Sequence, residues 1–145
     1  MFEIKKMMRE HTDEVLEMMR VFYASPAVLS NGSEEIFQYD IENCVNASPY
    51  LEGFVFVKEE KILGYAMIAK SFSTEFGKTC IWIEDLYMKP ECRGMGIGTA
   101  FFSWLDEKYP NTVKRLEVEE ENEKALHVYR KCGFEELPYM EMKKE

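Results

Sequence analysis

The chain has 145 residues, of which 46% are hydrophobic, so it can bury one core and is too apolar to be intrinsically disordered. Its 27 acidic residues outnumber its 18 basic residues, and the net charge of −9 disfavours binding to nucleic acid phosphates. No apolar run approaches the ~20 residues that span a bilayer, and the N-terminal residues lack a signal-peptide pattern. We therefore expect a single domain over residues 1–145 that is cytoplasmic and has no membrane partner.

The cysteine content and the excess of acidic residues further limit the kinds of site and ligand that we expect. Four cysteines, Cys44, Cys80, Cys92 and Cys132, form no C-x-x-C pair, and only two histidines accompany them. This composition favours free thiols in a reducing compartment and no metal site. The acidic excess is typical of a solvated surface, and it would also attract a cationic ligand such as a polyamine.

The N-terminal half alternates between strand and helix patterns. Hydrophobic periodicity predicts a strand at 2–8, helices at 12–23 and 33–46, and strands at 54–57 and 62–72 that form a hairpin. Thr12 is placed to cap the first helix, and Ser25-Pro26 breaks it. On the second helix Ile36 is expected to face inward, but Asp40 falls on the same face and weakens the pattern.

The C-terminal half repeats strand-to-helix steps. It predicts strands at 79–88 and 113–118, each followed by a helix, at 97–109 and 122–131, and further strand material at 134–143. Pro90 ends the first of these strands, and Gly133 closes the last helix. Strands followed by helices between strands predict an α/β fold of the α+β type, with a central mixed sheet and helices on both of its faces.

A glycine-rich turn at the start of the helix at 97–109 is the clearest functional signal. Residues 93–98 read Arg-Gly-Met-Gly-Ile-Gly, directly after a strand. The first N–H groups of a helix have no partner within the helix, and the helix dipole favours negative charge there. Glycines let an anion approach the main chain, so we expect a phosphate or diphosphate cradle with Arg93 as an added cation.

Two common glycine motifs do not fit. A Walker A loop ending at Gly77-Lys78-Thr79 would need a glycine at position 72, which is phenylalanine. A dinucleotide fingerprint G-x-G-x-x-G would need a glycine at position 99 or 101, and these are Thr99 and Phe101. The pattern that does fit is R-x-x-G-x-G, at Arg93, Gly96 and Gly98.

Two blocks of the chain resemble the GNAT superfamily of N-acetyltransferases, which use acetyl-CoA. The first block runs from residue 83 through the glycines to 98. The second comprises Leu116-Glu117-Val118, Asn122, Ala125, Tyr129 and the segment 131–134. The resemblance implies a mostly antiparallel sheet in which the strands before the two helices splay apart, and the pantetheine arm of the cofactor lies in the gap. Many members pair through sheet edges or C-terminal strands, so a homodimer is an open alternative.

The resemblance also assigns cofactor contacts. It implies main-chain bonds to the acetyl group and pantetheine from the strand, a pyrophosphate contact at the glycine turn, and further contacts from one face of the following helix. The residues expected to bind the cofactor are Leu86, Tyr87, Met88, Arg93, Gly94, Met95, Gly96, Ile97, Gly98, Thr99, Asn122, Ala125 and Tyr129. Asn122, Ala125 and Tyr129 share a helix face because they lie at i, i+3 and i+7.

Acetyl transfer to an amine also needs a base and an acid. A free alkyl ammonium has a pKa of ~10.4 and must lose a proton before it attacks. Glu84 matches a position that serves as the base or binds a water in several family members, and Asp85 is the alternative. Neighbouring strand residues point to opposite faces, so only one of the two faces the cleft unless the strand is bulged. Tyr129 is the candidate acid that protonates the thiolate.

The acceptor is less well specified. The resemblance places the acceptor side at residues 22–31, 37–41 and 71–78, where Tyr23, Tyr39 and Phe76 could form an aromatic wall for a cation. Nothing in the sequence separates such a wall from ordinary core packing, and we favour core packing as the explanation of these side chains. We predict transfer of an acetyl group to a small cationic primary amine by direct attack in a ternary complex. The alternatives are acetylation of a protein lysine or N-terminus, and a non-catalytic acyl-CoA-binding module.

Overall fold

A computed structural model describes residues 1–28 and 32–145. The strands are β1 (Glu3–Lys6), β2 (Leu51–Lys58), β3 (Lys61–Ser73), β4 (Lys78–Met88) and β5 (Val113–Leu116). The α-helices are α1 (Thr12–Tyr23), α2 (Glu34–Val45), α3 (Ile97–Lys108) and α4 (Glu123–Lys131), and two short 3-10 helices are η1 (Arg9–His11) and η2 (Pro90–Cys92). Each expected element up to residue 131 is therefore present, with boundaries shifted by a few residues.

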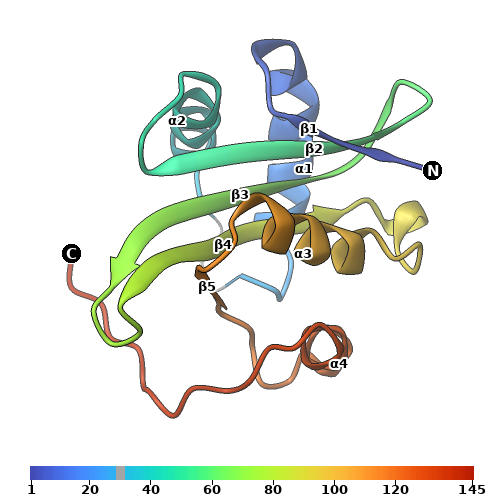
Figure 1. Ribbon diagram of the computed structural model, residues 1–145. Coiled ribbons are helices and arrows are strands. Elements are labelled where there is room, and N and C mark those ends of the chain that lie inside the picture. Colours follow the sequence, from blue (N-terminus) through green and yellow to red (C-terminus); the bar gives the residue numbers. More distant parts are fainter. Residues whose placement is uncertain (29–31) are drawn as a thin grey trace.

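The described strands form one sheet in the order β1-β2-β3-β4-β5. The β1–β2, β2–β3 and β3–β4 pairs are antiparallel, and β4–β5 is parallel. This confirms the expected mixed, mostly antiparallel sheet. Two hydrophobic clusters flank it. One packs α1 and α2 against one face, with Tyr65 and Tyr87 from the strands, and the other packs α3 against the opposite face, with Ile81 and Ile83. Figure 1 shows these two layers, with α4 set apart beyond β5.

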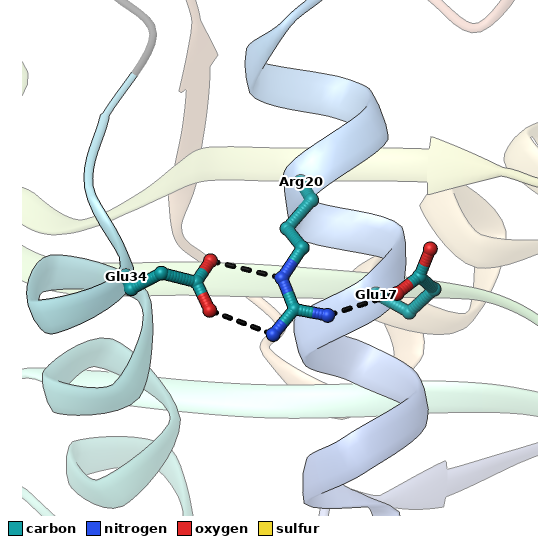
Figure 2. Close-up of polar contacts among 3 residues, drawn as sticks. All are labelled: Glu17, Arg20 and Glu34. Carbon is teal, nitrogen blue, oxygen red and sulfur yellow. Dashed lines mark hydrogen bonds and ion pairs between the residues drawn. The ribbon is translucent and has the colours of Figure 1, made fainter.

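An ion-pair bridge joins the two helices on the α1–α2 side. The guanidinium of Arg20 on α1 donates two hydrogen bonds to Glu34 of α2, from Nε at 2.9 Å and from Nη2 at 2.6 Å. Its Nη1 donates to Glu17 at 2.8 Å, as Figure 2 shows. The hydrogen bonds to both carboxylates raise the pKa of Arg20, and the bond from Arg20 lowers the pKa of Glu34. This bidentate pair links α2 to α1 at the surface, where an exposed ion pair contributes little to stability.

A β-bulge in β4 changes which side of the sheet its residues face. Met67 on β3 is opposite Asp85, and the next residue, Ile68, is opposite Ile83, so Glu84 is the extra residue. An uninterrupted strand would place Ile83 and Asp85 on one face. Instead Ile83 packs on the α3 side, whereas Asp85 bonds to Tyr65 in the core on the α1–α2 side.

Three expectations about the elements were wrong. Residues 134–143 form no strand. Pro138 has no N–H to donate there, and most of the side chains, including Glu135 and Glu136, are exposed. Thr12 is not the cap of α1 but its first residue, and its hydroxyl donates to the Arg9 carbonyl. Ile36 does not face inward, because it is 53% exposed.

The described residues also limit other kinds of site. All four cysteines are free, and three of them are buried. Within residues 1–28 and 32–145, no cluster of three or more His, Cys, Asp or Glu side chains is arranged to hold a metal ion. In the same part of the chain, no helix combines the length and apolar character needed to cross a bilayer.

Candidate functional site

The main cleft begins where β4 and β5 separate. The last paired residues of these two parallel strands are Ile83 and Leu116. Beyond them β4 continues to Met88, whereas the chain after Leu116 turns away toward α4. The cleft has a volume of about 1120 Å³ and is lined from both sides of this gap. Residues of β4 from Glu84 onward therefore lie along an edge of the sheet that β5 leaves unpaired.

The glycine turn forms one end of the cleft. Gly94 and Gly96 have φ of 81° and 77°, a left-handed conformation that favours glycine, and Gly96 is the residue before α3. The first α-helical bond of α3 runs from the Ala100 N–H to the Gly96 carbonyl, so the N–H groups of the first turn are free for a ligand. Both Gly94 and Gly98 line the cleft.

Open space surrounds the glycines. A Cβ at Gly94 or Gly96 would meet no heavy atom of the described residues within 4 Å, apart from the chain neighbours. A Cβ at Gly98 would meet only Leu86 Cδ2, at 4.0 Å. Gly98 is helical, where glycine costs about 0.5–1 kcal/mol relative to alanine, and packing gives no reason for that cost. The bare main chain therefore fits a phosphate group of the expected cofactor.

Arg93 holds the turn and also lines the cleft. Its Nε donates to the Met88 carbonyl at 3.1 Å, and its guanidinium lies 5.6 Å from the centre of the Tyr87 ring. The side chain is exposed, so its remaining N–H groups face solvent at the mouth of the cleft. This position provides a cation next to the free N–H groups of α3, as expected for an anion site.

Helix α4 provides the opposite wall. Asn122, Ala125 and Tyr129 all line the cleft, in agreement with the helix face predicted from their spacing. The Asn122 side-chain oxygen accepts a hydrogen bond from the Ala125 N–H at 3.3 Å and so caps the helix. The Tyr129 ring packs edge-on against Phe102 of α3, and burial raises the pKa of its phenol, which stays protonated near neutral pH.

The two candidate bases lie in different environments because of the bulge. Glu84 lines the cleft, and its pKa is raised by burial and then by the charges of Asp85 and Glu141. Asp85 is 4% exposed, does not line the cleft, and accepts hydrogen bonds from Tyr23 at 2.9 Å and Tyr65 at 2.7 Å. Of these two residues, Glu84 is therefore the one placed to exchange a proton with a molecule in the cleft.

Sequence reasoning missed five further carboxylates of the cleft, and two of them, Glu117 and Glu141, interact with each other. Glu117 follows β5, and Glu141 comes from the C-terminal segment, where Tyr139 also donates a hydrogen bond to Glu75 in the turn between β3 and β4. A hydrogen bond with Glu141, followed by burial and the charges of Glu141 and Glu84, raises the pKa of Glu117 to about 7. Glu117 belongs to the segment 116–118 that resembles the family, so the sequence offered a signal for it. No periodicity predicts that the chain brings Glu141 back to Glu117.

Not every expected cofactor residue lines the cleft. Side chains or main chain of Leu86, Tyr87, Met88, Arg93, Gly94, Gly98, Asn122, Ala125 and Tyr129 do so. Met95 is exposed on the turn, Gly96 precedes the helix, Thr99 is exposed on its first turn, and Ile97 is buried in the core under α3. Gly96 has no side chain and Ile97 is buried, so these two residues can contact a ligand only through their main chain.

The aromatic wall that the sequence left open for the acceptor is not formed. Tyr23 lines the cleft, as do Phe22, Ser25, Ala27 and Val28, whereas residues 29–31 lie outside the described part of the chain. Tyr39 is 67% exposed on α2, and Phe76 lies by a separate hollow next to β5. Neither lines the main cleft, so the three aromatic rings do not form one wall.

Known proteins show similarities along the chain. The bovine (Bos taurus) thialysine N-epsilon-acetyltransferase is 34% identical over 79 residues, which cover 52% of this chain and 46% of that protein. The aligned part therefore spans about half the length of this curated relative. A crystal structure of a possible acetyltransferase from Clostridium difficile 630 superimposes with a TM-score of 0.83, at 20% identity, covering 99% of this chain and 97% of that one.

A second solved structure is bound to a ligand. The aminoglycoside N-acetyltransferase AAC(6')-Iy in complex with CoA has a TM-score of 0.77 and 15% identity, covering all of this chain and 95% of that one. At these identities the two structures establish the fold. The family is established by its sequence model, which is described as the acetyltransferase (GNAT) family and matches residues 13–134. The chain belongs to the GNAT acetyltransferase family.

Proposed function

We propose that this protein is an N-acetyltransferase that transfers the acetyl group of acetyl-CoA to a small cationic primary amine. The observation that carries the proposal is the gap after Ile83 and Leu116, because one cleft there joins the glycine turn, the unpaired edge of β4 and the Tyr129 face of α4. Family membership and the relatives named for acetylating thialysine and aminoglycosides support it.

The cofactor fits the residues at one end of the cleft. The free N–H groups of the first turn of α3 and the Arg93 guanidinium would bind the pyrophosphate, and the open space at Gly94 and Gly98 lets it approach the main chain. The main chain of residues 86–88 and the side chain of Asn122 would bind the pantetheine arm. Acetyl-CoA supplies the thioester whose acetyl carbon the amine attacks, directly and within a ternary complex.

The chain's own residues would move the two protons. Glu84 faces the cleft with a raised pKa, so its carboxylate can take a proton from the acceptor ammonium or from a water between them. A carbon–nitrogen bond then forms as the carbon–sulfur bond breaks, and the nitrogen releases a second proton, which replaces the one that Tyr129 gives to the thiolate. The Tyr129 phenol, held against Phe102, gives its proton to the departing thiolate. A main-chain N–H of β4 stabilises the negative charge on the carbonyl oxygen.

The charges along the cleft favour a cationic acceptor. Six glutamates line it: Glu84, Glu117, Glu119, Glu120, Glu121 and Glu141. Arg93 and Lys124 also line the cleft, so its acidic side chains outnumber its basic ones by six to two. An excess of one sign of charge raises the local concentration of molecules of the opposite sign. The same charge disfavours a peptide segment rich in acidic residues. We further propose a cytoplasmic location, which agrees with the four free thiols. Sedimentation measurements would test whether the protein pairs into a homodimer.

A panel of acceptors tests the proposal. The full chain is incubated with acetyl-CoA and, separately, with thialysine, spermidine, neamine, lysine-containing peptides and no acceptor, and free CoA thiol is measured. We expect release above the acceptor-free rate with at least one small diamine or polyamine, and slower release with peptides. Release with peptides alone would favour a protein acetyltransferase. Calorimetric CoA binding without release for any amine would favour a non-catalytic module and overturn the proposal.

A further inference from the structure

A buried carboxylate lies beside the cleft and is connected to it by one hydroxyl. The Asp85 oxygens each accept one tyrosine hydrogen bond, Oδ1 from Tyr23 and Oδ2 from Tyr65. Placing a carboxyl group in this core costs free energy, and its hydrogen bonds offset the cost only in part, since the pKa of Asp85 stays above its ordinary value because of burial. A chain that needed only a stable core would be better served by an apolar side chain at this position.

The two tyrosines that hold Asp85 have different surroundings. Tyr65, on β3, is fully buried at 0% exposure and belongs to the core under α1. Tyr23, the last residue of α1, is half-buried and lines the cleft. Its ring is held by Phe22 and Phe37, whose centres lie 5.4 Å and 5.0 Å away. Of the two hydroxyl groups that donate to Asp85, that of Tyr65 is therefore enclosed in the core, whereas that of Tyr23 can be reached by a ligand in the cleft.

The bond to Asp85 determines what Tyr23 can offer a ligand. A tyrosine hydroxyl has one hydrogen and two lone pairs. Because the hydrogen of Tyr23 is donated to Asp85, the oxygen can only accept from a molecule in the cleft. A hydroxyl that donates to a carboxyl oxygen is also polarised, which makes its own oxygen a better acceptor. The nearby carboxylates Asp40 and Glu84 add negative potential, since both raise the pKa of Tyr23 after burial and Asp85.

We propose that Tyr23 binds an N–H group of the acceptor amine, and that Asp85 is the positioning residue that orients the Tyr23 hydroxyl for this contact. The inference rests on the proposed function, because it assigns the amine side of the same cleft. The contact would also select acceptors by their chemistry. The site takes amines that donate a hydrogen bond, preferably as cations, and it discriminates against acceptors that could only accept one.

Two matched substitutions separate binding from folding. Tyr23→Phe and Tyr65→Phe each remove one hydroxyl from Asp85 and keep the ring. CoA release by the full chain is measured against thialysine, or against the fastest acceptor of the panel, at saturating acetyl-CoA. We expect Tyr23→Phe to raise the KM for the amine about tenfold, the loss of one hydrogen bond to a charged group, with the KM for acetyl-CoA unchanged. Tyr65→Phe should lower Tm and change the amine KM by less than about twofold.

A double-mutant cycle tests whether Asp85 acts through Tyr23. Asp85→Asn should raise the amine KM in the wild-type background and have no further effect in the Tyr23→Phe background. Equal effects in both backgrounds, an unchanged amine KM in Tyr23→Phe, or an equal rise in Tyr65→Phe would each overturn the inference. If Asp85→Asn does not fold, the comparison of the two tyrosine variants still decides it. A wild-type protein that releases no CoA with any amine would overturn the proposed function and this inference together, before any variant is made.

Discussion

The substitution Gly98→Ala should stabilise the protein and weaken its binding of CoA. Gly98 lies in the first turn of α3, and a Cβ there would meet only Leu86 Cδ2 at 4.0 Å, an ordinary contact distance. In the unliganded protein the methyl group is therefore tolerated. In the proposed complex it occupies the space through which the pyrophosphate approaches the N–H groups of the helix.

Both effects have an expected size. Replacing a helical glycine by alanine at an unstrained position stabilises a protein by about 0.5–1 kcal/mol. For a chain of this length, that corresponds to a rise in Tm of roughly 2–4 °C. Forcing one methyl group into a close contact costs about 1–3 kcal/mol, which lowers the affinity for CoA by at least fivefold and up to about a hundredfold.

Thermal unfolding and CoA titration calorimetry on the same samples measure the two effects. Ser103→Ala is a matched control, because Ser103 is exposed on the same helix and does not line the cleft. It should gain a similar amount of helix stability and keep its affinity for CoA. Gly96→Ala should instead lose stability, because Gly96 has φ of 77°. A Gly98→Ala protein that binds CoA as tightly as wild type would show that the bare main chain at this turn does not hold the cofactor.

Three further outcomes follow from the site and the fold. Tyr129→Phe should lower kcat by about 10²-fold or more and leave the calorimetric affinity for CoA within about threefold, whereas an unchanged kcat would remove Tyr129 as the acid. Glu141→Gln should shift the acidic limb of the kcat/KM profile to lower pH. Burial, then the charge of Asp85 and then that of Glu141 raise the pKa of Glu84, so removing the Glu141 charge lets Glu84 stay ionised at lower pH. An unmoved limb would count against Glu84 as the base. Arg20→Gln should slightly lower Tm at low ionic strength, with the difference closing at about 1 M salt, and a difference that persists there would indicate packing by the stem of the side chain.

The sequence was sufficient to predict the parts of the site that local rules govern. The spacing of Asn122, Ala125 and Tyr129 predicts one helix face, and all three residues line the cleft. Glycines at 94 and 96 predict a turn with positive φ before a helix, which the structure shows. In each case the signal spans a few residues within a single element, where helix periodicity and glycine conformation apply without knowledge of the rest of the fold.

The parts of the site that the sequence did not predict depend on contacts between residues far apart in the chain. A bulge depends on how β4 aligns with β3, so the sequence could only leave the sides of Glu84 and Asp85 open. The return of Glu141 to Glu117 depends on the path of an irregular segment that has no periodicity. Tyr39 fits neither the aromatic wall nor the core packing that the sequence left open, because an exposed aromatic residue on a helix has the same local pattern as a buried one or one that lines a cleft.

The bulge explains how neighbouring carboxylates can have separate roles. If β4 were regular, Ile83 and Asp85 would share a face, so Asp85 would lie on the α3 side beside the cluster around Ile83 and away from Tyr23 and Tyr65. The extra residue turns Asp85 toward Tyr23 and Tyr65 on the other side and leaves Glu84 at the edge that β5 has left. Burial fixes the first carboxyl in place, and the cleft exposes the second to the substrate. In the proposed mechanism, one inserted residue therefore separates the group that positions the amine from the group that takes its proton. Differing environments assign acid–base roles to paired carboxylates in other sites in the same way.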